Sequence, residues 1–337
     1  MTDILNALVL FSNFVLVPGV AYGAQLALGA LGLTMIYAVL RFTNVAYGDT
    51  MAFGAMCTIF VTWGLQALGV SFGPLPTALL ALPFGIIGAV LLCLVFDRTV
   101  YRFYRRQKAP PVVFLIVSIG VMFMTNGIVR LIIGVDDQRF ADGARFIVTA
   151  GDFKEMTGLA EGLAIRSTQA LTLVVALVVM IALFRFLNRT RMGKAMRAYS
   201  DNEDLALLSG INPDRVVFWA WVIAGGLATI AGVLYGLDKS FKPFTYFQLL
   251  LPIFAATIVG GIGNPLGAIA GGFLIAFSEV TVTYAYKRFL GYLVPESWEP
   301  EGLVQLLSTD YKFAVSFVIL VVVLLFRPTG SHDSGTR

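Results

Sequence analysis

Residues that could perform covalent or metal chemistry are sparse in this sequence. Its one histidine, His332, lies in a polar C-terminal stretch. A histidine-based metal site is therefore excluded, and a Ser-His-Asp triad would need that stretch to fold back onto the rest of the chain. The two cysteines, Cys57 and Cys93, lie in apolar runs and are interpreted as small packing residues. The sequence thus offers no metal site and no catalytic residue.

Three glycine motifs match patterns found in soluble enzymes but lack the context that those patterns need. A nucleophile elbow is matched by GVSFG at residues 69–73, although that motif needs a strand-turn-helix and a histidine partner. A dinucleotide loop is matched by GIGNPLG at residues 261–267, without the flanking βαβ unit. Gly193-Lys194 ends like a phosphate loop, but Ala195 follows where serine or threonine belongs. The chain therefore has no ATP site of its own.

The composition predicts a polytopic membrane protein. The chain has 337 residues, of which 58% are hydrophobic and 13% charged, whereas soluble domains carry about 25% charged residues. Because so few charges cannot cover a chain of this length with a water-facing surface, most soluble enzymes, disordered chains and disulfide-stapled secreted domains are excluded. The net charge of +4 is interpreted as a topology signal and not as a signature of nucleic-acid binding.

The apolar runs are long enough for spanning helices, because a hydrocarbon core about 30 Å thick needs roughly 20 helical residues. We expect an all-α polytopic fold with about nine transmembrane helices, within a range of eight to ten. An N-terminal segment, 1–18, could add a further helix at 4–17, either spanning the membrane or lying in its interface. The seventh run is short and is either a half-helix or the first limb of a bent element. The nine runs are 19–40, 45–69, 74–96, 111–134, 168–187, 216–237, 249–262, 265–286 and 312–326.

Charges in the loops set the expected orientation. Loops 97–110 and 185–215 hold five and six basic residues, so the positive-inside rule places both in the cytoplasm. Loops 135–166 and 288–310 hold six and four acids and are placed outside. The expected domain organisation is a transmembrane domain at 19–328, with a cytoplasmic loop at 188–215 and an external loop at 135–166, followed by a disordered tail at 329–337.

The second cytoplasmic loop is more than a polar connection. It contains an apolar stretch at 205–208, and Ser200 or Asp201 could cap a short helix that ends at Gly210. A second helix is expected after Asn212-Pro213, with the asparagine as its N-cap. A short amphipathic helix of this kind suits either docking into a groove on a partner protein or lying on the lipid surface.

Three segments carry a more specific signal. They are NVAYGD at residues 44–49, the glycine-rich run at 255–272, and a pattern in the second cytoplasmic loop formed by Gly193, Arg197, Ala198, Ala206 and GIN at 210–212. Together they resemble the branched-chain amino-acid-type ABC permeases. These are the membrane subunits of leucine, isoleucine and valine uptake systems and of their urea and short-chain amide relatives. The resemblance covers roughly residues 23–326.

The resemblance implies a non-catalytic subunit that pairs with a second permease, homologous or identical, and with two cytoplasmic ATPases that use ATP and magnesium. It also implies a periplasmic substrate-binding protein and a multi-pass position in the bacterial inner membrane, in contact with lipid and not with nucleic acid. No cofactor is expected in this chain itself. The loop at 188–215 would be a coupling loop that docks on the ATPase through Gly193, Arg197, Ala198, Asp201, Ala206, Gly210 and Ile211.

A second group of residues is expected in the translocation pathway or its gate. Asn44 and Asp49 are placed at the cytoplasmic end of the second helix, where Asp49 either pairs with Arg41 or helps to form the inner gate. Many members of the family carry histidine where this chain has Tyr47, which leaves a titratable role there in doubt. The full group is Asn44, Tyr47, Gly48, Asp49, Gly260, Gly261, Gly263, Asn264 and Gly267.

The glycine-rich run also has a packing interpretation. Gly263, Gly267 and Gly271 recur at every fourth residue, which would place them on one face of a helix and let another helix approach closely. Asn264-Pro265 is expected to end one helix and to begin the next. Tight packing at a bend and a role in lining or gating the pore both stay open.

The expected function is ATP-driven import, with this chain forming half of the pathway for branched-chain or related amino acids. The alternative within the family is a urea or short-chain amide permease. An ion-coupled secondary transporter would need ion-coordinating acids or broken helices at mid-membrane, and Asp49 and the short seventh run are the only hints of these. A membrane enzyme would need clustered polar catalytic residues, which the single histidine argues against.

Overall fold

The structure confirms an all-α polytopic fold with about nine transmembrane helices. It is a computed structural model and describes residues 2–73, 75–140, 145–293, 302 and 304–326. Eight helical spans in these ranges are long and apolar enough to cross a membrane, and α15 is a shorter ninth. The segment 329–337 with His332, expected to be a disordered tail, lies outside the described residues.

The long helices are α2 (Val17–Leu40), α3 (Tyr47–Ala67), α4 (Ala78–Phe96), α6 (Pro111–Ile133), α8 (Ser167–Arg189), α11 (Pro213–Asp238), α12 (Pro243–Gly260), α13 (Pro265–Thr283) and α15 (Lys312–Phe326). The short helical elements are α1 (Thr2–Phe11), η1 (Ser12–Leu16), η2 (Asp97–Tyr101), α5 (Arg102–Arg106), α7 (Ala150–Thr157), α9 (Arg191–Asp201), α10 (Glu203–Leu208), α14 (Lys287–Gly291) and η4 (Thr309–Tyr311). Two short strands, β1 (Phe146–Val148) and β2 (Ile165–Arg166), pair antiparallel.

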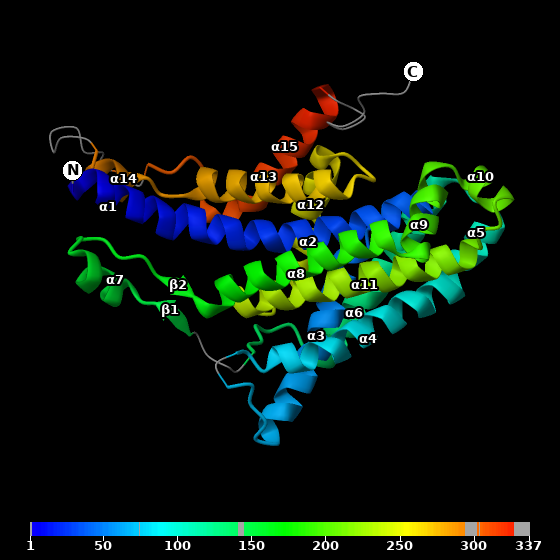
Figure 1. Cartoon of the computed structure of the whole chain (residues 1–337), viewed down its shortest axis with the longest axis horizontal. Coiled ribbons are helices and arrows are strands. Elements are labelled where there is room, and N and C mark those ends of the chain that lie inside the picture. Colours follow the sequence, from blue (N-terminus) through cyan, green and yellow to red (C-terminus); the bar gives the residue numbers. More distant parts are fainter. Residues whose placement is uncertain (1, 74, 141–144, 294–301, 303, 327–337) are drawn as a thin grey trace.

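The first helix is much longer than a membrane span. Elements α1, η1 and α2 form one continuous helix of 39 residues, about 58 Å long at a rise of 1.5 Å per residue. The segment at 4–17 is thus the N-terminal end of the first spanning helix, at the end of the bundle opposite α9 and α10 (Figure 1). The side-chain oxygens of Asn6 and Asn13 accept hydrogen bonds from the backbone amides of Glu161 (3.2 Å) and Ala164 (2.9 Å). This N-terminal end therefore holds the long loop between α6 and α8 in place.

The loops gather at the two ends of the bundle according to their charge. Elements α5, α9 and α10, which belong to the two basic loops, lie together at one end of the molecule, and α1, α7, α14 and the strands lie at the other (Figure 1). The orientation expected from the basic residues requires this arrangement. We refer to the end with α5, α9 and α10 as the inner end of the bundle.

Helix α2 is the core of the bundle, because every residue from 21 to 36 is buried. It runs beside α13 along much of its length (Figure 1). A Cβ atom added at Gly23 would overlap Phe273 of α13, and one at Gly272 would lie 2.6 Å from the backbone nitrogen of Ala27. Since lipid gives no hydrophobic force between helices, such close backbone contacts are a main source of helix association in a membrane.

The glycine-rich run forms a tight α12–turn–α13 hairpin. Gly260 and Gly267 approach so closely that a Cβ on either would overlap the backbone of the other, and Gly271 meets the backbone of Ala256 in the same way. The expected helix start at Asn264-Pro265 is confirmed, and Asn264 caps α13, its side-chain oxygen accepting from the amides of Leu266 (3.1 Å) and Gly267 (3.2 Å). These contacts support the packing interpretation.

Two expectations about this hairpin were wrong. Gly263 does not belong to a helical row with Gly267: it lies in the turn before α13 with a φ of 84°, a left-handed conformation that favours glycine. The seventh run, expected to start at residue 249, is not a half-helix, because α12 starts at Pro243 and spans 18 residues. The alternative, the first limb of a bent element, agrees with the hairpin. The first turns of α12 include Tyr246, whose polar hydroxyl lowers the hydropathy there, so the apolar run was expected to begin later in the sequence. In the structure the Tyr246 hydroxyl donates to the carbonyl of Gly232 at 2.8 Å.

The close approach of α12 and α13 makes a stability prediction. Gly267→Ala is expected to destabilise the protein by about 1–3 kcal/mol, because the new methyl overlaps backbone that cannot move aside. The matched control is Gly120→Ala in α6, where an added Cβ meets no atom within 4 Å. That control should melt at an unchanged or slightly higher temperature, since alanine favours helix by about 1 kcal/mol. Thermal unfolding in detergent would measure both, and equal losses would contradict the packing.

Candidate functional site

The loop at 188–215 folds into two short helices, α9 and α10, each with its own cap. Thr190 accepts from the amide of Gly193 (2.9 Å), and Asn202 accepts from the amide of Leu205 (3.0 Å). The expectation that Ser200 or Asp201 caps a single helix was therefore wrong, because both lie in the last turn of α9 and the extended backbone of Asn202 separates the helices. The cap on α11 is the expected one, with the Asn212 side chain accepting from the amides of residues 214 and 215.

Contacts to the spanning helices hold α9 and α10 in place. The guanidinium of Arg41, at the end of α2, donates to the carbonyl of Ser200. The buried Tyr199 hydroxyl donates to Glu203 at 2.6 Å and so joins α9 to α10. Burial, together with that bond, raises the pKa of Tyr199 well above its usual value, so the phenol stays a donor. Gly193 packs directly on the backbone of Leu187 in α8. These contacts attach the two short helices to the ends of α2 and α8.

The residues assigned to ATPase docking divide into two groups. Gly193 and Ala206 are buried inside this chain, with Ala206 only 3% exposed. Ile211 is half-buried, while Arg197, Ala198, Asp201 and Gly210 are exposed. Three exposed leucines of α10 were noticed as an apolar stretch but were not included in the docking group: Leu205, Leu207 and Leu208. Exposure, and not residue size, identifies the surface that a partner can reach.

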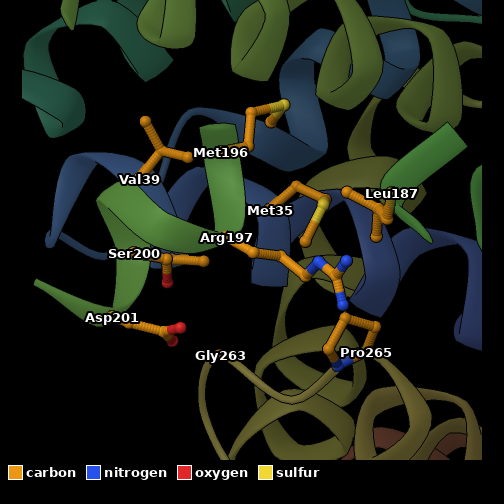
Figure 2. Close-up of a pocket in the computed structure, with 10 residues that line it drawn as sticks. Met35, Val39, Leu187, Met196, Arg197, Ser200, Asp201, Gly263 and Pro265 are labelled. Carbon is orange, nitrogen blue, oxygen red and sulfur yellow. The ribbon is translucent and has the colours of Figure 1, made fainter. Parts of the chain in front are cut away.

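A cavity of 160 Å³ brings the loop helices and the glycine turn together. Arg197 and Asp201 of α9 line it with Gly263 and Pro265, and α2 contributes Met35 (Figure 2). The spacing of Arg197 and Asp201 predicts an ion pair within α9, but no such pair forms among the described residues. Figure 2 shows the Arg197 side chain extended toward Pro265. Two segments far apart in the sequence thus meet at the inner end of the bundle.

The segment at 44–49 is buried in the bundle and positions the start of α3. The Asn44 side-chain oxygen accepts from the amide of Ala46 at 3.1 Å and from the Tyr101 hydroxyl at 3.5 Å. The Tyr47 side chain packs directly against Gly32 of α2, where any larger residue would overlap it. Gly48 lies against the carbonyl of Tyr246 in α12. The segment therefore connects α2, α3 and α12 through close contacts.

Asp49 lies much deeper than expected, and the predicted pairing with Arg41 was wrong. Its carboxylate accepts a hydrogen bond from the Asn126 amide of α6 at 2.6 Å. Asn126 is 15 residues from the start of α6, so this contact lies about 22 Å from the inner end of that helix. The reason is that residues 42–46 run back into the bundle before α3 begins, with the amide of Val45 bonded to Ser118 at 3.2 Å.

A buried polar cluster around Glu279 was missed in the sequence. Glu279 of α13 is 1% exposed and accepts from the Ser316 hydroxyl of α15. The ammonium of Lys312 lies 4.3 Å from the centre of the Tyr22 ring, and both groups neighbour this carboxylate. The sequence does contain a signal for this cluster, because Glu279 is a single acid inside the apolar run of α13. The high average hydropathy of the run concealed it. Within the described ranges, no group of three or more His, Cys, Asp or Glu side chains could hold a metal ion.

Comparisons with known proteins agree with this architecture. Residues 15–324 match the model of a family described as branched-chain amino acid transport system / permease component. The high-affinity branched-chain amino acid permease protein LivH of Salmonella typhimurium is 30% identical over 321 residues, covering 93% of this chain and 92% of LivH. BraD of Pseudomonas aeruginosa is 29% identical over 316 residues, covering 94% of each chain. LivM of Escherichia coli is 26% identical over 152 residues, covering 42% of this chain and 36% of LivM.

The contact between α3 and α6 is testable by a double-mutant cycle. Asn126→Leu is expected to cost roughly 2 kcal/mol, because it leaves the buried Asp49 carboxylate without its donor. Adding Asp49→Leu should recover part of that loss, since no unpaired charge then stays buried. Apparent melting temperatures of the two single variants and the double variant would give the coupling. Strictly additive losses would contradict the hydrogen bond.

Proposed function

The chain belongs to the family of branched-chain amino acid transport system permease components, and from that premise we propose that it forms half of the pathway for branched-chain amino acids in an ABC importer of the bacterial inner membrane. It is a multi-pass, non-catalytic transport subunit. The family match over residues 15–324 carries the proposal. The permease names of relatives that align over more than nine-tenths of the chain support it.

The importer proposed here contains three further kinds of subunit. A second permease, homologous or identical, completes the pathway, and the partial similarity to the separate permease LivM favours a homologous one. Two cytoplasmic ATPases bind ATP and magnesium, which this chain does not. A periplasmic binding protein delivers the substrate to the outer end of the bundle. These partners follow from the family and from the absence of an ATP-binding motif in the sequence.

The surface proposed for ATPase docking is the exposed side of α9 and α10. Its leucines are the main observation in favour, because apolar side chains exposed at the inner end, outside the membrane span, indicate a protein partner. Arg197, Ala198, Asp201, Gly210 and Ile211 contribute to the same surface. Gly193 and Ala206 face the interior of the chain: Gly193 lets α9 pack closely on α8, and Ala206 is the buried residue of α10.

The proposed route for coupling runs from this surface into the membrane. Movement of α9 would reach α2 through the bond of Arg41 to Ser200, and would reach the turn before α13 across the cavity of Figure 2. Packing contacts at both ends of α12 would then transmit it to the start of α3. We assign to this route the residues expected in the pathway or its gate: Asn44, Tyr47, Gly48, Asp49, Gly260, Gly261, Gly263, Asn264 and Gly267.

The docking surface predicts the effect of one charge. Leu208→Glu is expected to abolish co-purification of an ATPase with the tagged chain from its native membrane, because a carboxylate in an apolar protein contact is left desolvated. Leu208 is 85% exposed, so folding should be unaffected. Met156→Glu is the matched control, since Met156 is 83% exposed on α7 at the opposite end. Equal ATPase recovery with both variants would contradict the docking surface, and no ATPase with the unaltered chain would favour a secondary transporter.

The proposed substrate predicts a selective uptake defect. Cells that lack this chain should take up radiolabelled leucine, isoleucine and valine at a strongly reduced rate at micromolar concentration, and urea and acetamide at an unchanged rate. Restoring the gene should restore uptake of the three amino acids. A defect confined to urea or acetamide would instead assign the chain to the amide branch of the family.

A further inference from the structure

A second cavity lies between α3, α6 and α12 and has a volume of 230 Å³. Its polar lining consists of Asp49, Asn126 and Arg130, and its apolar lining includes Phe123, Phe244 and Phe247. The cavity therefore combines one anionic group, one cationic group and a set of aromatic rings within a membrane domain. Ionisable residues inside membrane spans usually face a cavity or a partner and mark a substrate or ion path.

One carboxylate oxygen on the anionic side of the cavity lacks a hydrogen-bond partner among the described residues. Asp49 is fully buried, at 0% exposure. One of its carboxylate oxygens accepts from Asn126 at 2.6 Å, while the other has no hydrogen-bond partner within the described part of the chain. A buried carboxylate with a free oxygen is costly unless a donor reaches it. The side-chain oxygen of Asn126 is a further acceptor at the same place. Together these groups suit a ligand that donates several hydrogen bonds and carries positive charge.

The cationic side of the cavity also lacks an ion-pair partner. The guanidinium of Arg130 lies 5.9 Å from the centre of the Phe244 ring, and among the described residues it forms no salt bridge. Arg130 is one turn beyond Asn126 on α6, an offset of about 6 Å along the helix. An arginine matches the two oxygens of a carboxylate with paired donors. The two charges of the cavity thus face each other without a direct salt bridge among the described residues, and a ligand that carries both opposite charges can bind between them.

We propose that this cavity binds the α-ammonium and α-carboxylate groups of an amino acid. Asp49 and Asn126 accept from the ammonium, Arg130 donates to the carboxylate, and the rings of Phe244 and Phe247 cover an apolar side chain. The inference rests on the proposed function for the substrate class. The inference goes beyond that function because it places a zwitterion-selective site in the membrane subunit. The proposed function alone leaves selection of the substrate to the binding protein.

The position of Arg130 favours this over a lipid contact. An arginine near a helix end in lipid extends toward the headgroups, whereas this one lines the same cavity as a buried carboxylate. Phe123 and Phe244, which line the cavity, are also exposed on the surface of this subunit. Ionisable groups next to such a surface are expensive against lipid. The proposal therefore turns this face toward the second permease and the translocation pathway.

The test is equilibrium binding of radiolabelled L-leucine to the assembled transporter, purified through this chain and freed of the binding protein. Two competitors separate the charges: leucinamide, which lacks the carboxylate, and 4-methylpentanoate, which lacks the ammonium. Each should compete about tenfold more weakly than leucine, the usual effect of losing one charged hydrogen-bonding group. Asp49→Asn should erase the preference for leucine over 4-methylpentanoate, and Arg130→Gln the preference for leucine over leucinamide.

Two variants with the same chemical changes serve as controls. Asp152→Asn on α7 and Arg288→Gln on α14 neutralise exposed residues outside this cavity, and both should keep the discrimination among the three ligands. Arg130→Gln keeps the test decisive even if Asp49→Asn fails to fold, because Arg130 is only half-buried.

The outcomes separate this inference from the proposed function. If the complete importer transports leucine but both cavity variants discriminate like the unaltered protein, the site is wrong and the function stands. Leucine transport with no leucine binding to the isolated transporter overturns the site in the same way. So does competition by both analogues as strong as that by leucine, because neither charged group would then be recognised. If the complete importer transports no leucine, the proposed function itself fails.

Discussion

Direct contact between helix backbones is the constraint on which the rest of this structure depends. In a bilayer the lipid chains are as apolar as the side chains, so helices gain little from burying leucine and much from fitting closely. Glycine supplies that fit where α2 meets α13 and where Gly260 meets Gly267. These contacts hold α2 at the centre of the bundle, and they fix the turn before α13 in the position where it meets the loop helices at the inner end (Figure 2).

Helix α12 connects the two cavities described above. Its last residue, Gly260, leads into the turn that shares a cavity with Arg197, and its first turns carry Phe244 and Phe247 of the proposed amino-acid cavity. A single packed helix therefore spans the distance between the surface proposed for ATPase docking and the site proposed for substrate. Gly48 lies against the carbonyl of Tyr246, so a shift of α12 would also shift α3 and its Asp49. A ligand can drive such a shift only if it binds the two arrangements with different affinity.

The sequence predicts those features of the protein that arise from local chemistry. Hydropathy located the spans, Asn212 caps the helix it was expected to cap, and α13 begins at Pro265 as the Asn264-Pro265 pair indicated. The sequence could not predict features that depend on tertiary packing. The depth of Asp49 follows from the path of residues 42–46 through the bundle, and the start of α12 is hidden by polar residues that find partners only in the folded chain. Glu279 is one acid in an apolar run, and its importance shows only once α15 covers it.

The central claim is that ATP hydrolysis in partner subunits moves an amino acid through this chain. It is tested most directly by reconstituting the complex purified through this chain into vesicles and measuring uptake of labelled leucine under two energy sources. The expected result is uptake that requires the binding protein outside together with ATP and magnesium on the ATPase side, and that persists when ion gradients are collapsed. Uptake driven by a proton or sodium gradient without ATP would contradict the claim and identify the chain as a secondary transporter.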